Sequence, residues 1–80
     1  MRESEVAGAE ILILSGEFDV IEKERVEAYL SRLLTKSPKV LIVDMCRLSL
    51  IDSSGIGLLI AYHSKLREAG TRMVVVACQN

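Results

Sequence analysis

The residues best suited to chemistry stand together in one polar stretch, which contains Asp52, Ser53, Ser54 and Gly55 and lies between two hydrophobic segments. The second segment has a helical period, so the serines fall at a predicted helix N-terminus. A serine there can simply be the N-cap, because its side chain accepts a hydrogen bond from an unpaired amide of the first turn. An exposed serine there could also carry a phosphate, which adds about −1.5 to −2 charges. Beside Asp52, that charge would repel a partner that docks on the neutral patch, while the fold persists.

Glycine is also concentrated at this corner, at Gly55 and Gly57. Glycine costs roughly 1 kcal/mol relative to alanine inside a helix, so two glycines in a first turn suggest an open backbone or the close approach of another group. The pair does not extend to Gly-x-Gly-x-x-Gly, since position 60 is Ile, and no Gly-Lys-Ser or Gly-Lys-Thr occurs. These nucleotide-binding motifs are therefore missing, and we expect no cofactor.

The sequence offers no suitably placed histidine as the base for a catalytic serine. A nucleophilic serine needs a base within reach. The single histidine, His63, lies more than two turns along the same predicted helix. It also falls on the apolar stripe of that helix, so we interpret it as a partly buried core residue. The sequence therefore predicts that this chain is not an enzyme.

The cysteines, Cys46 and Cys78, are far apart in the sequence and stand in apolar surroundings. A secreted scaffold of this size normally carries more cysteines, evenly paired. We therefore interpret both residues as reduced, buried thiols. With no Cys-x-x-Cys pair and an isolated histidine, the chain has no ligand set for a metal.

The composition is that of one small globular domain, residues 1–80. Half of the residues are hydrophobic, 26% are charged and the net charge is −1. This balance argues against a nucleic-acid partner, which usually requires a basic surface. The N-terminal residues do not resemble a signal peptide, and the longest apolar run is far short of the ~20 residues of a membrane span. We expect a cytoplasmic protein without a membrane partner.

The period of the apolar residues changes several times along the chain, and these changes predict the elements that position the polar corner. Residues 11–14 predict a strand buried on both faces and stopped by Ser15 and Gly16, and residues 40–43 predict a second buried strand closed by Asp44. The amphipathic helix predicted between them has its apolar residues at Val26, Tyr29, Leu30, Leu33 and Leu34.

Local signals predict where the helices begin and end. Asp19 and Glu22 form a start signal of the capping-box type, and Pro38 ends the first helix. The apolar positions of the second helix are Ile56, Leu59, Ile60, His63 and Leu66. Gly70 stands where a left-handed cap of that helix is expected.

The last strand is predicted at residues 73–76, and residues 1–9 could supply one more short strand. The elements then alternate as strand, helix, strand, helix, strand. Such alternation predicts an α/β fold with a small, mostly parallel sheet and packed helices.

Residues 48–57, with the sequence LSLIDSSGIG, resemble the phosphorylation-site segment of STAS domains, in particular of bacterial anti-sigma factor antagonists. The family pattern is an apolar strand end, Asp-Ser-Ser/Thr-Gly, an apolar residue, Gly, and then an apolar helix. Residues 40–44 are similar to the strand that precedes this segment in the family. Residues 15–19 are similar to its Gly-Glu-apolar-Asp segment. The three segments stand in the family's order, and the resemblance extends from Ile11 to about Val76.

The resemblance implies a non-enzymatic, phosphorylation-controlled switch in the regulation of transcription. Ser53 matches the phosphoacceptor, Ser54 matches a neighbouring hydroxyl that modulates or caps, and Asp19 matches the acid on the adjacent loop. Asp52, Gly55 and Gly57 complete the surroundings of the site. The implied partners are an anti-sigma factor, which is a serine kinase that supplies its own ATP, and a serine phosphatase. Unphosphorylated antagonist would bind the kinase and free the sigma factor, and phosphorylated antagonist would let go.

The chain departs from the family pattern after the last predicted strand, where members usually continue into a further apolar helix and this sequence stops at Asn80. We expect the face beside residues 73–76 to lack a cover and to favour a homodimer or strand exchange. The sequence leaves a second function open, in which the chain is a scaffold or sensor STAS module in a larger signalling assembly. A small hydrolase with a serine nucleophile is disfavoured by the position of His63.

Overall fold

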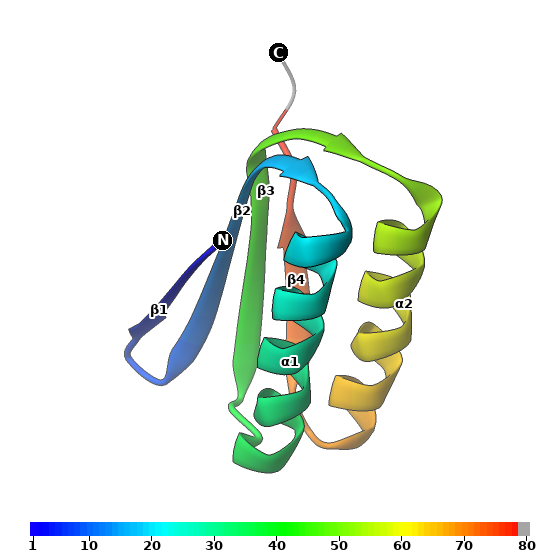
Figure 1. Cartoon of the computed structure of the whole chain (residues 1–80). Helices are drawn as coiled ribbons and strands as arrows, with labels where there is room; N and C mark the ends of the chain where they lie inside the picture. The colour runs from blue at the N-terminus through cyan, green and yellow to red at the C-terminus, as the bar shows by residue number, and fades with distance from the viewer. Residues whose placement is uncertain (79–80) are drawn as a thin grey trace.

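The elements alternate as the sequence predicts, and the further short strand expected within residues 1–9 is present. The computed structural model describes residues 1–78. Its elements are β1 (Arg2–Val6), β2 (Ala9–Phe18), α1 (Val20–Lys36), β3 (Val40–Ile51), α2 (Ser53–Glu68) and β4 (Arg72–Val76). The strands form one sheet in the order β1-β2-β3-β4, in which β1 is antiparallel to β2 and the other pairs are parallel (Figure 1). The predicted α/β fold with a mostly parallel sheet is confirmed.

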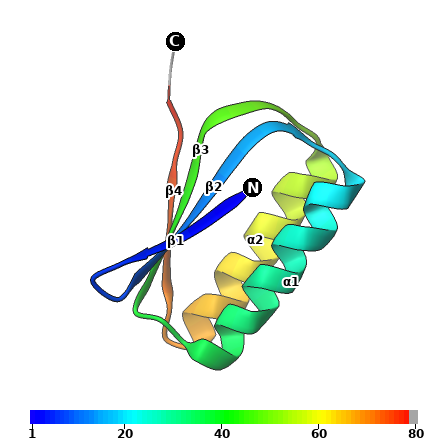
Figure 2. The same ribbon diagram turned by 60° about the vertical axis from the view of Figure 1, so that its left-hand side comes forward.

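The helices α1 and α2 cover one face of the sheet (Figure 2). Each parallel strand is added on the same side of the previous one, so crossovers of one hand bring both helices to the same face. Leu12, Leu14, Leu41 and Val43 point to that face and are fully buried. Side chains of the opposite face, such as Ile13, are only half-buried. The prediction that the first strand is buried on both faces is therefore wrong.

The strands β2 and β3 are longer than predicted, because each continues through the polar residues that were expected to end it. Gly16 adopts a φ of 71° inside β2, in the left-handed region that suits glycine. In β3 the strand continues past Asp44 through a bulge. Ile13 pairs with Asp44 and Ser15 pairs with Arg47, so two residues of β3 oppose one of β2. A bulge accommodates the extra residue and bends its strand.

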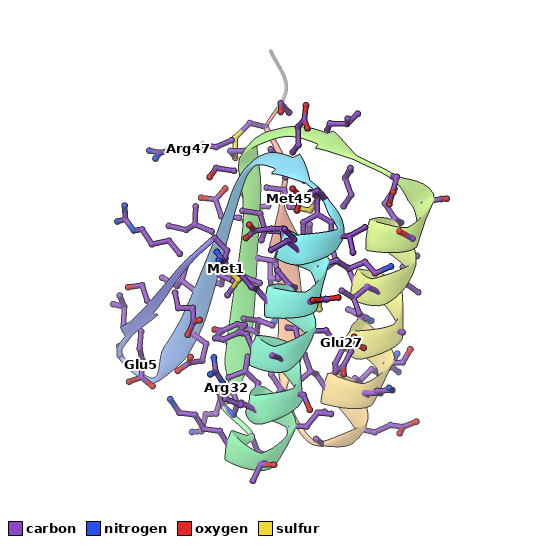
Figure 3. The ribbon with its side chains drawn as sticks, in the orientation of Figure 1. Met1, Glu5, Glu27, Arg32, Met45 and Arg47 are labelled. Carbon is purple, nitrogen blue, oxygen red and sulfur yellow. A yellow bond between two sulfur atoms is a disulfide. The ribbon has the colours of Figure 1, made fainter. Side chains whose placement is uncertain are left out.

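The bulge in β3 consists of Met45 and Cys46 and reverses which residues of the strand face the helices. The backbone N–H of Cys46 donates to Asp44 Oδ1 at 2.9 Å. Met45 still lies on the helix side, whereas Arg47 projects away from the molecule (Figure 3). Regular alternation would put these two residues on the same face. Because the bulge shifts the phase, Leu48 rather than Arg47 packs against the core.

The first helix, α1, matches its predicted pattern. Its buried residues are Val26, Tyr29, Leu30 and Leu33. It ends at Lys36, before Pro38, and Ser37 adopts a left-handed conformation. The buried carboxylate of Glu10 in β2 accepts hydrogen bonds from the Tyr29 hydroxyl (3.2 Å) and the Lys36 ammonium (2.8 Å). These bonds attach α1 to β2, and the Lys36 contact lowers the pKa of Glu10.

The second helix, α2, is rotated relative to the predicted apolar stripe. Its buried side chains are Leu59, Tyr62 and Leu66. Ile60 and His63 are exposed, so the interpretation of His63 as a partly buried core residue is wrong. Tyr62 is buried instead, and the Lys65 ammonium lies over the face of its ring, 4.7 Å from the ring centre. Gly70 follows the helix with a φ of 91°, as predicted.

The cysteines, Cys46 and Cys78, form a disulfide, so the interpretation of two reduced, buried thiols is wrong. Their separation of 32 residues in the sequence is also the offset between paired residues of β3 and β4, such as Val40 and Arg72. Parallel pairing therefore brings them opposite each other, with their Cα atoms 4.8 Å apart. Cys46 is half-buried and Cys78 is exposed.

In the described residues 1–78, no helix follows β4. An apolar groove of about 270 Å³ lies between α2 and the β4 edge, and its lining includes Met45, Ile56, Ile60, Met73 and Val75. The face beside residues 73–76 is thus open over the part of the chain that the structure describes. Neither α1 nor α2 combines the length and the apolar character that a membrane-spanning helix needs.

Candidate functional site

The aspartates Asp19 and Asp52 stand immediately before α1 and α2, at the same end of the sheet. Phe18 and Ile51 are paired in register at the ends of β2 and β3, so the next residues, Asp19 and Asp52, leave adjacent strands at the same end of the sheet. Figure 1 shows α1 and α2 starting at this common end. The structure therefore brings Asp19 to the same end as the Asp52-Ser53-Ser54-Gly55 corner, although more than thirty residues separate them.

Each aspartate caps the helix that follows it. Asp19 Oδ1 accepts a hydrogen bond from the Glu22 N–H, and Asp52 Oδ1 accepts one from the Gly55 N–H, both at 2.9 Å. Both aspartates have extended backbones, as N-cap residues do. The predicted helix start at Asp19 is confirmed. The carboxylate of Glu22 contacts the Met1 amino group at 2.8 Å.

Neither serine is the N-cap, so the interpretation of a serine as the cap of the second helix is wrong. The Ser54 hydroxyl donates to Asp52 Oδ1 at 2.7 Å, and the same oxygen accepts the Gly55 N–H. A carboxylate is the stronger acceptor at the positive end of a helix, which explains why Asp52 takes this position. Ser54 therefore supports the cap rather than forming it.

The Ser53 side chain is exposed at the first position of α2. No hydrogen bond between residues 1–78 involves its hydroxyl, whereas Asp52 and Ser54 are both engaged in the cap. Ser53 lies at a helix N-terminus, where free N–H groups and the helix dipole favour an anion. A group added to this hydroxyl would therefore replace no hydrogen bond among residues 1–78.

The electrostatics of the corner are set by Asp52. The Gly55 N–H, and after it the Ser54 hydroxyl, hold the pKa of Asp52 below its ordinary value. The field of Lys23 on α1 contributes in the same direction. Asp52 is therefore an anion at neutral pH, and the corner carries one fixed negative charge beside a neutral, exposed hydroxyl.

The two glycines of the corner have different environments. Gly55 is buried, and a Cβ on it would lie 2.5 Å from Phe18 Cδ1 and 2.9 Å from Ile51 Cγ1. The close approach that the sequence suggests is thus made by the protein's own core. A Cβ on Gly57 would have no atom within 4 Å, because Gly57 is exposed. Gly57 leaves an open surface one turn after Ser53.

Large exposed apolar side chains lie at the end of the molecule that holds the corner, and the sequence pattern alone does not show that they are exposed. Val20 and Ile21 in the first turn of α1 are 70% and 63% exposed, and Leu50, two residues before Asp52, is 62% exposed. Ile56 in α2 is also exposed. The helical spacing could have indicated the exposure of Val20 and Ile21, because both positions fall outside the buried face of α1. We call these four residues the apolar rim.

Other chemistry has little support at this corner. His63 lies ten residues beyond Ser53 in α2, which is about 15 Å along the helix axis. In residues 1–78, no three His, Cys, Asp or Glu side chains are grouped so that they could hold a metal ion. The corner presents an exposed hydroxyl beside a carboxylate and an apolar surface, and His63 lies too far away to reach that hydroxyl.

Comparisons with known proteins identify the family of this fold. Residues 3–80 match the family model of the STAS domain. The unphosphorylated form of the anti-sigma factor antagonist SpoIIAA has a similar structure, with a TM-score of 0.85 and 25% identity over 99% of this chain and 74% of that chain. An anti-sigma factor antagonist from Mycobacterium paratuberculosis gives a TM-score of 0.84 and 24% identity, over 98% of this chain and 66% of that chain.

A sulfate transporter family protein from Wolinella succinogenes is also similar, with a TM-score of 0.72 and 27% identity over 88% of this chain and 57% of that chain. The comparison with curated proteins finds no match. The family match covers nearly the whole chain and includes the capped corner and both helices. The chain belongs to the STAS domain family.

Proposed function

We propose that this STAS domain is an anti-sigma factor antagonist whose binding is switched by phosphorylation of Ser53. The unphosphorylated chain binds an anti-sigma factor that is a serine kinase, and this binding frees the sigma factor. The observation that carries the proposal is the state of Ser53, which is exposed, at a helix N-terminus and outside the capping bonds that hold the corner. The kinase supplies ATP, a serine phosphatase resets the switch, and the chain itself performs no catalysis.

The charge at the corner supports a switch that acts on the partner rather than on the fold. A phosphate on Ser53 would add about −1.5 to −2 charges next to the ionised Asp52. The exposed helix N-terminus can tolerate this charge, since its amides and dipole favour anions. A partner surface packed against the corner would have to bury the same charge without its hydration, which is costly. Phosphorylation therefore releases the partner and leaves the domain folded.

The apolar rim supports a protein partner. Val20, Ile21, Leu50 and Ile56 expose large side chains at the end of the molecule where Asp19 and Ser53 lie. Exposed apolar groups gathered around a polar centre are typical of protein-binding surfaces. Gly57 has no side chain to project from the surface beside Ser53, so a partner could approach the hydroxyl closely. This surface would act in the cytoplasm, where sigma factors direct transcription.

A scaffold or sensor STAS module is the second candidate function. The likeness to a sulfate transporter family protein favours it, because it shows that the same domain fold occurs in a chain of another kind. In that function the apolar rim would contact other parts of an assembly. Ser53 would then stay unmodified or be modified only by a kinase of that assembly.

The deciding experiment is incubation of the chain with a cognate anti-sigma factor kinase and ATP, followed by mapping of the phosphate by mass spectrometry. We expect modification at Ser53 that is lost in Ser53→Ala. Ser54→Ala is the matched control, because its hydroxyl is engaged with Asp52, and it should retain the modification. A chain that stays unmodified and still assembles with other STAS modules would support the scaffold function instead.

A further inference from the structure

We propose that the Cys46–Cys78 disulfide is a reversible redox latch that controls the shape of the Ser53 corner. The regulatory meaning of this latch rests on the proposed function, in which Ser53 is the phosphorylated residue. An antagonist of an anti-sigma factor acts in the cytoplasm, where lasting structural disulfides are rare and those that occur are usually catalytic or redox-sensing. The positions of the two cysteines in the sheet give the latch its mechanism.

The two cysteines are held opposite each other by the sheet itself. The last residues of β3 and β4 that pair are Asp44 and Val76. Cys46 and Cys78 each stand two residues after this pair, so they keep the same register. The disulfide therefore takes the place of the next pairing after β4 ends. Because the register persists without the disulfide, the thiols stay close after reduction and can form the bond again.

Cys46 lies where β3 separates from β4. It belongs to the bulge opposite Leu14, and its N–H donates to the Asp44 side chain. Beyond the bulge, residues 47–51 pair only with residues 15–18 of β2 among the residues that the structure describes. Both views show this part of β3 bending over, away from β4 and toward the start of α2 (Figures 1 and 2).

The segment that bends away leads directly into the corner. It ends at Ile51, and Asp52 and Ser53 follow. In the oxidised chain this segment starts from a point that is tied covalently to the chain after β4. In both states residues 47–51 pair with β2 alone, and in the reduced chain the covalent tie at their start is gone. A segment that is held at fewer points opens locally more readily. Reduction should therefore loosen the segment and the first turn of α2.

The disulfide is accessible to reagents in solution. Cys78 is exposed and Cys46 is half-buried, and both lie beyond the last paired residues of β3 and β4. A dithiol reductant can attack a sulfur, form a mixed disulfide and close on itself, which transfers two electrons and two protons and leaves two cysteine thiols. Hydrogen peroxide reverses the change. One thiolate gives a sulfenic acid, the second thiol displaces water from it, and each peroxide yields two waters for one disulfide.

The latch is tested by amide hydrogen exchange of the wild-type chain before and after treatment with dithiothreitol, with the thiols counted by alkylation and mass spectrometry. We expect exchange of residues 47–55 to become faster by roughly tenfold on reduction, while the amides of residues 12–14 and 41–43 keep their rates. Addition of hydrogen peroxide after removal of the reductant should restore the slow exchange. Circular dichroism should be the same in both states.

The variant Cys78→Ser supplies the matched control, since the exposed position tolerates the change and the disulfide cannot form. Its exchange should equal that of the reduced wild type and should not respond to either reagent. Equal exchange of residues 47–55 in both states of the wild type would overturn the latch. So would loss of the circular dichroism signal on reduction, because the disulfide would then be a structural requirement.

This experiment needs no kinase, so its failure differs from failure of the proposed function. If Ser53 is phosphorylated and residues 47–55 ignore the redox state, the latch is wrong and the phosphorylation switch stands. If residues 47–55 respond to reduction and no anti-sigma factor kinase modifies Ser53, the proposed function is wrong.

Discussion

The ring of Phe18 packs so closely against the backbone of Gly55 that a Cβ on Gly55 would lie 2.5 Å from Phe18 Cδ1. Phe18 ends β2 and Gly55 lies in the first turn of α2, so this contact joins the start of one helix to the strand that leads into the other. The same glycine donates its N–H to the cap at Asp52. The position of Ser53 therefore depends on a core contact as well as on a cap.

Substitution of Gly55 should destabilise the domain, and substitution of Gly57 should not. Gly55→Ala forces the new methyl into Phe18 and Ile51, and overpacking of this kind costs typically about 1–3 kcal/mol of the free energy of unfolding. Gly57→Ala adds a methyl in open space on a helix and should raise the free energy of unfolding by up to about 1 kcal/mol. Urea denaturation of the two variants measures both values. Equal midpoints would contradict the contact.

A charge at position 53 should weaken binding of the kinase without unfolding the chain. We expect Ser53→Glu to lower the affinity for an anti-sigma factor kinase by at least about tenfold, because the partner must accept a second negative charge beside Asp52. Ser53→Gln has nearly the same size without the charge and serves as the control. Isothermal titration calorimetry gives the affinities, and circular dichroism should not change. An unfolded Ser53→Glu chain would show that the corner is structural.

The cap at Asp52 should make stability depend on pH. Its pKa is lowered in the folded state, chiefly by the Gly55 N–H, so the ionised form favours folding. This stability is present above the ordinary pKa of an aspartate and is lost as the pH falls through the lowered value. Asp52→Asn keeps a capping acceptor and removes the titration. The stability of the wild type relative to this variant should fall on acidification, and a difference that is independent of pH would refute this role.

The open β4 edge should allow two copies of the chain to associate. Val75 is 48% exposed and lines the groove beside α2, and no strand of residues 1–78 pairs with the outer side of β4. Exposed, apolar edge strands are typical sites of pairing between chains. Sedimentation at high concentration should show a dimer in the wild type and less of it in Val75→Lys. Val6→Lys on the β1 edge is the control, and a monomeric wild type would exclude the prediction.

The order of the elements and the location of the corner could be predicted from the sequence, because both depend on local patterns. The spacing of Val26, Leu30 and Leu33 indicates a helix wherever the chain folds, and Gly70 ends the second helix by its own backbone preference. The polar stretch around Ser53 stands out because it interrupts two apolar segments. These features arise from neighbours in the chain, so a single sequence displays them.

The roles of the residues inside the corner depended on geometry that no local pattern contains. Asp, Ser and Ser are all good N-cap residues, and only the backbone path out of β3 decides that Asp52 takes the cap and leaves Ser53 exposed. Gly55 and Gly57 look alike in the sequence, yet Phe18, which is distant in the chain, packs against Gly55 alone.

The assembled fold also settled the features that depend on strand register. Cys46 and Cys78 appear unrelated in the sequence, and the offset between β3 and β4 places them in contact. The strands continue through Gly16 and Asp44 because Gly16 adopts a positive φ and a bulge follows Asp44. One face of the sheet stays half-open because both crossovers run over the other face. Composition and period indicate which segments are strands. The pairing of each strand with the next is a long-range property, since it depends on packing summed over the whole core.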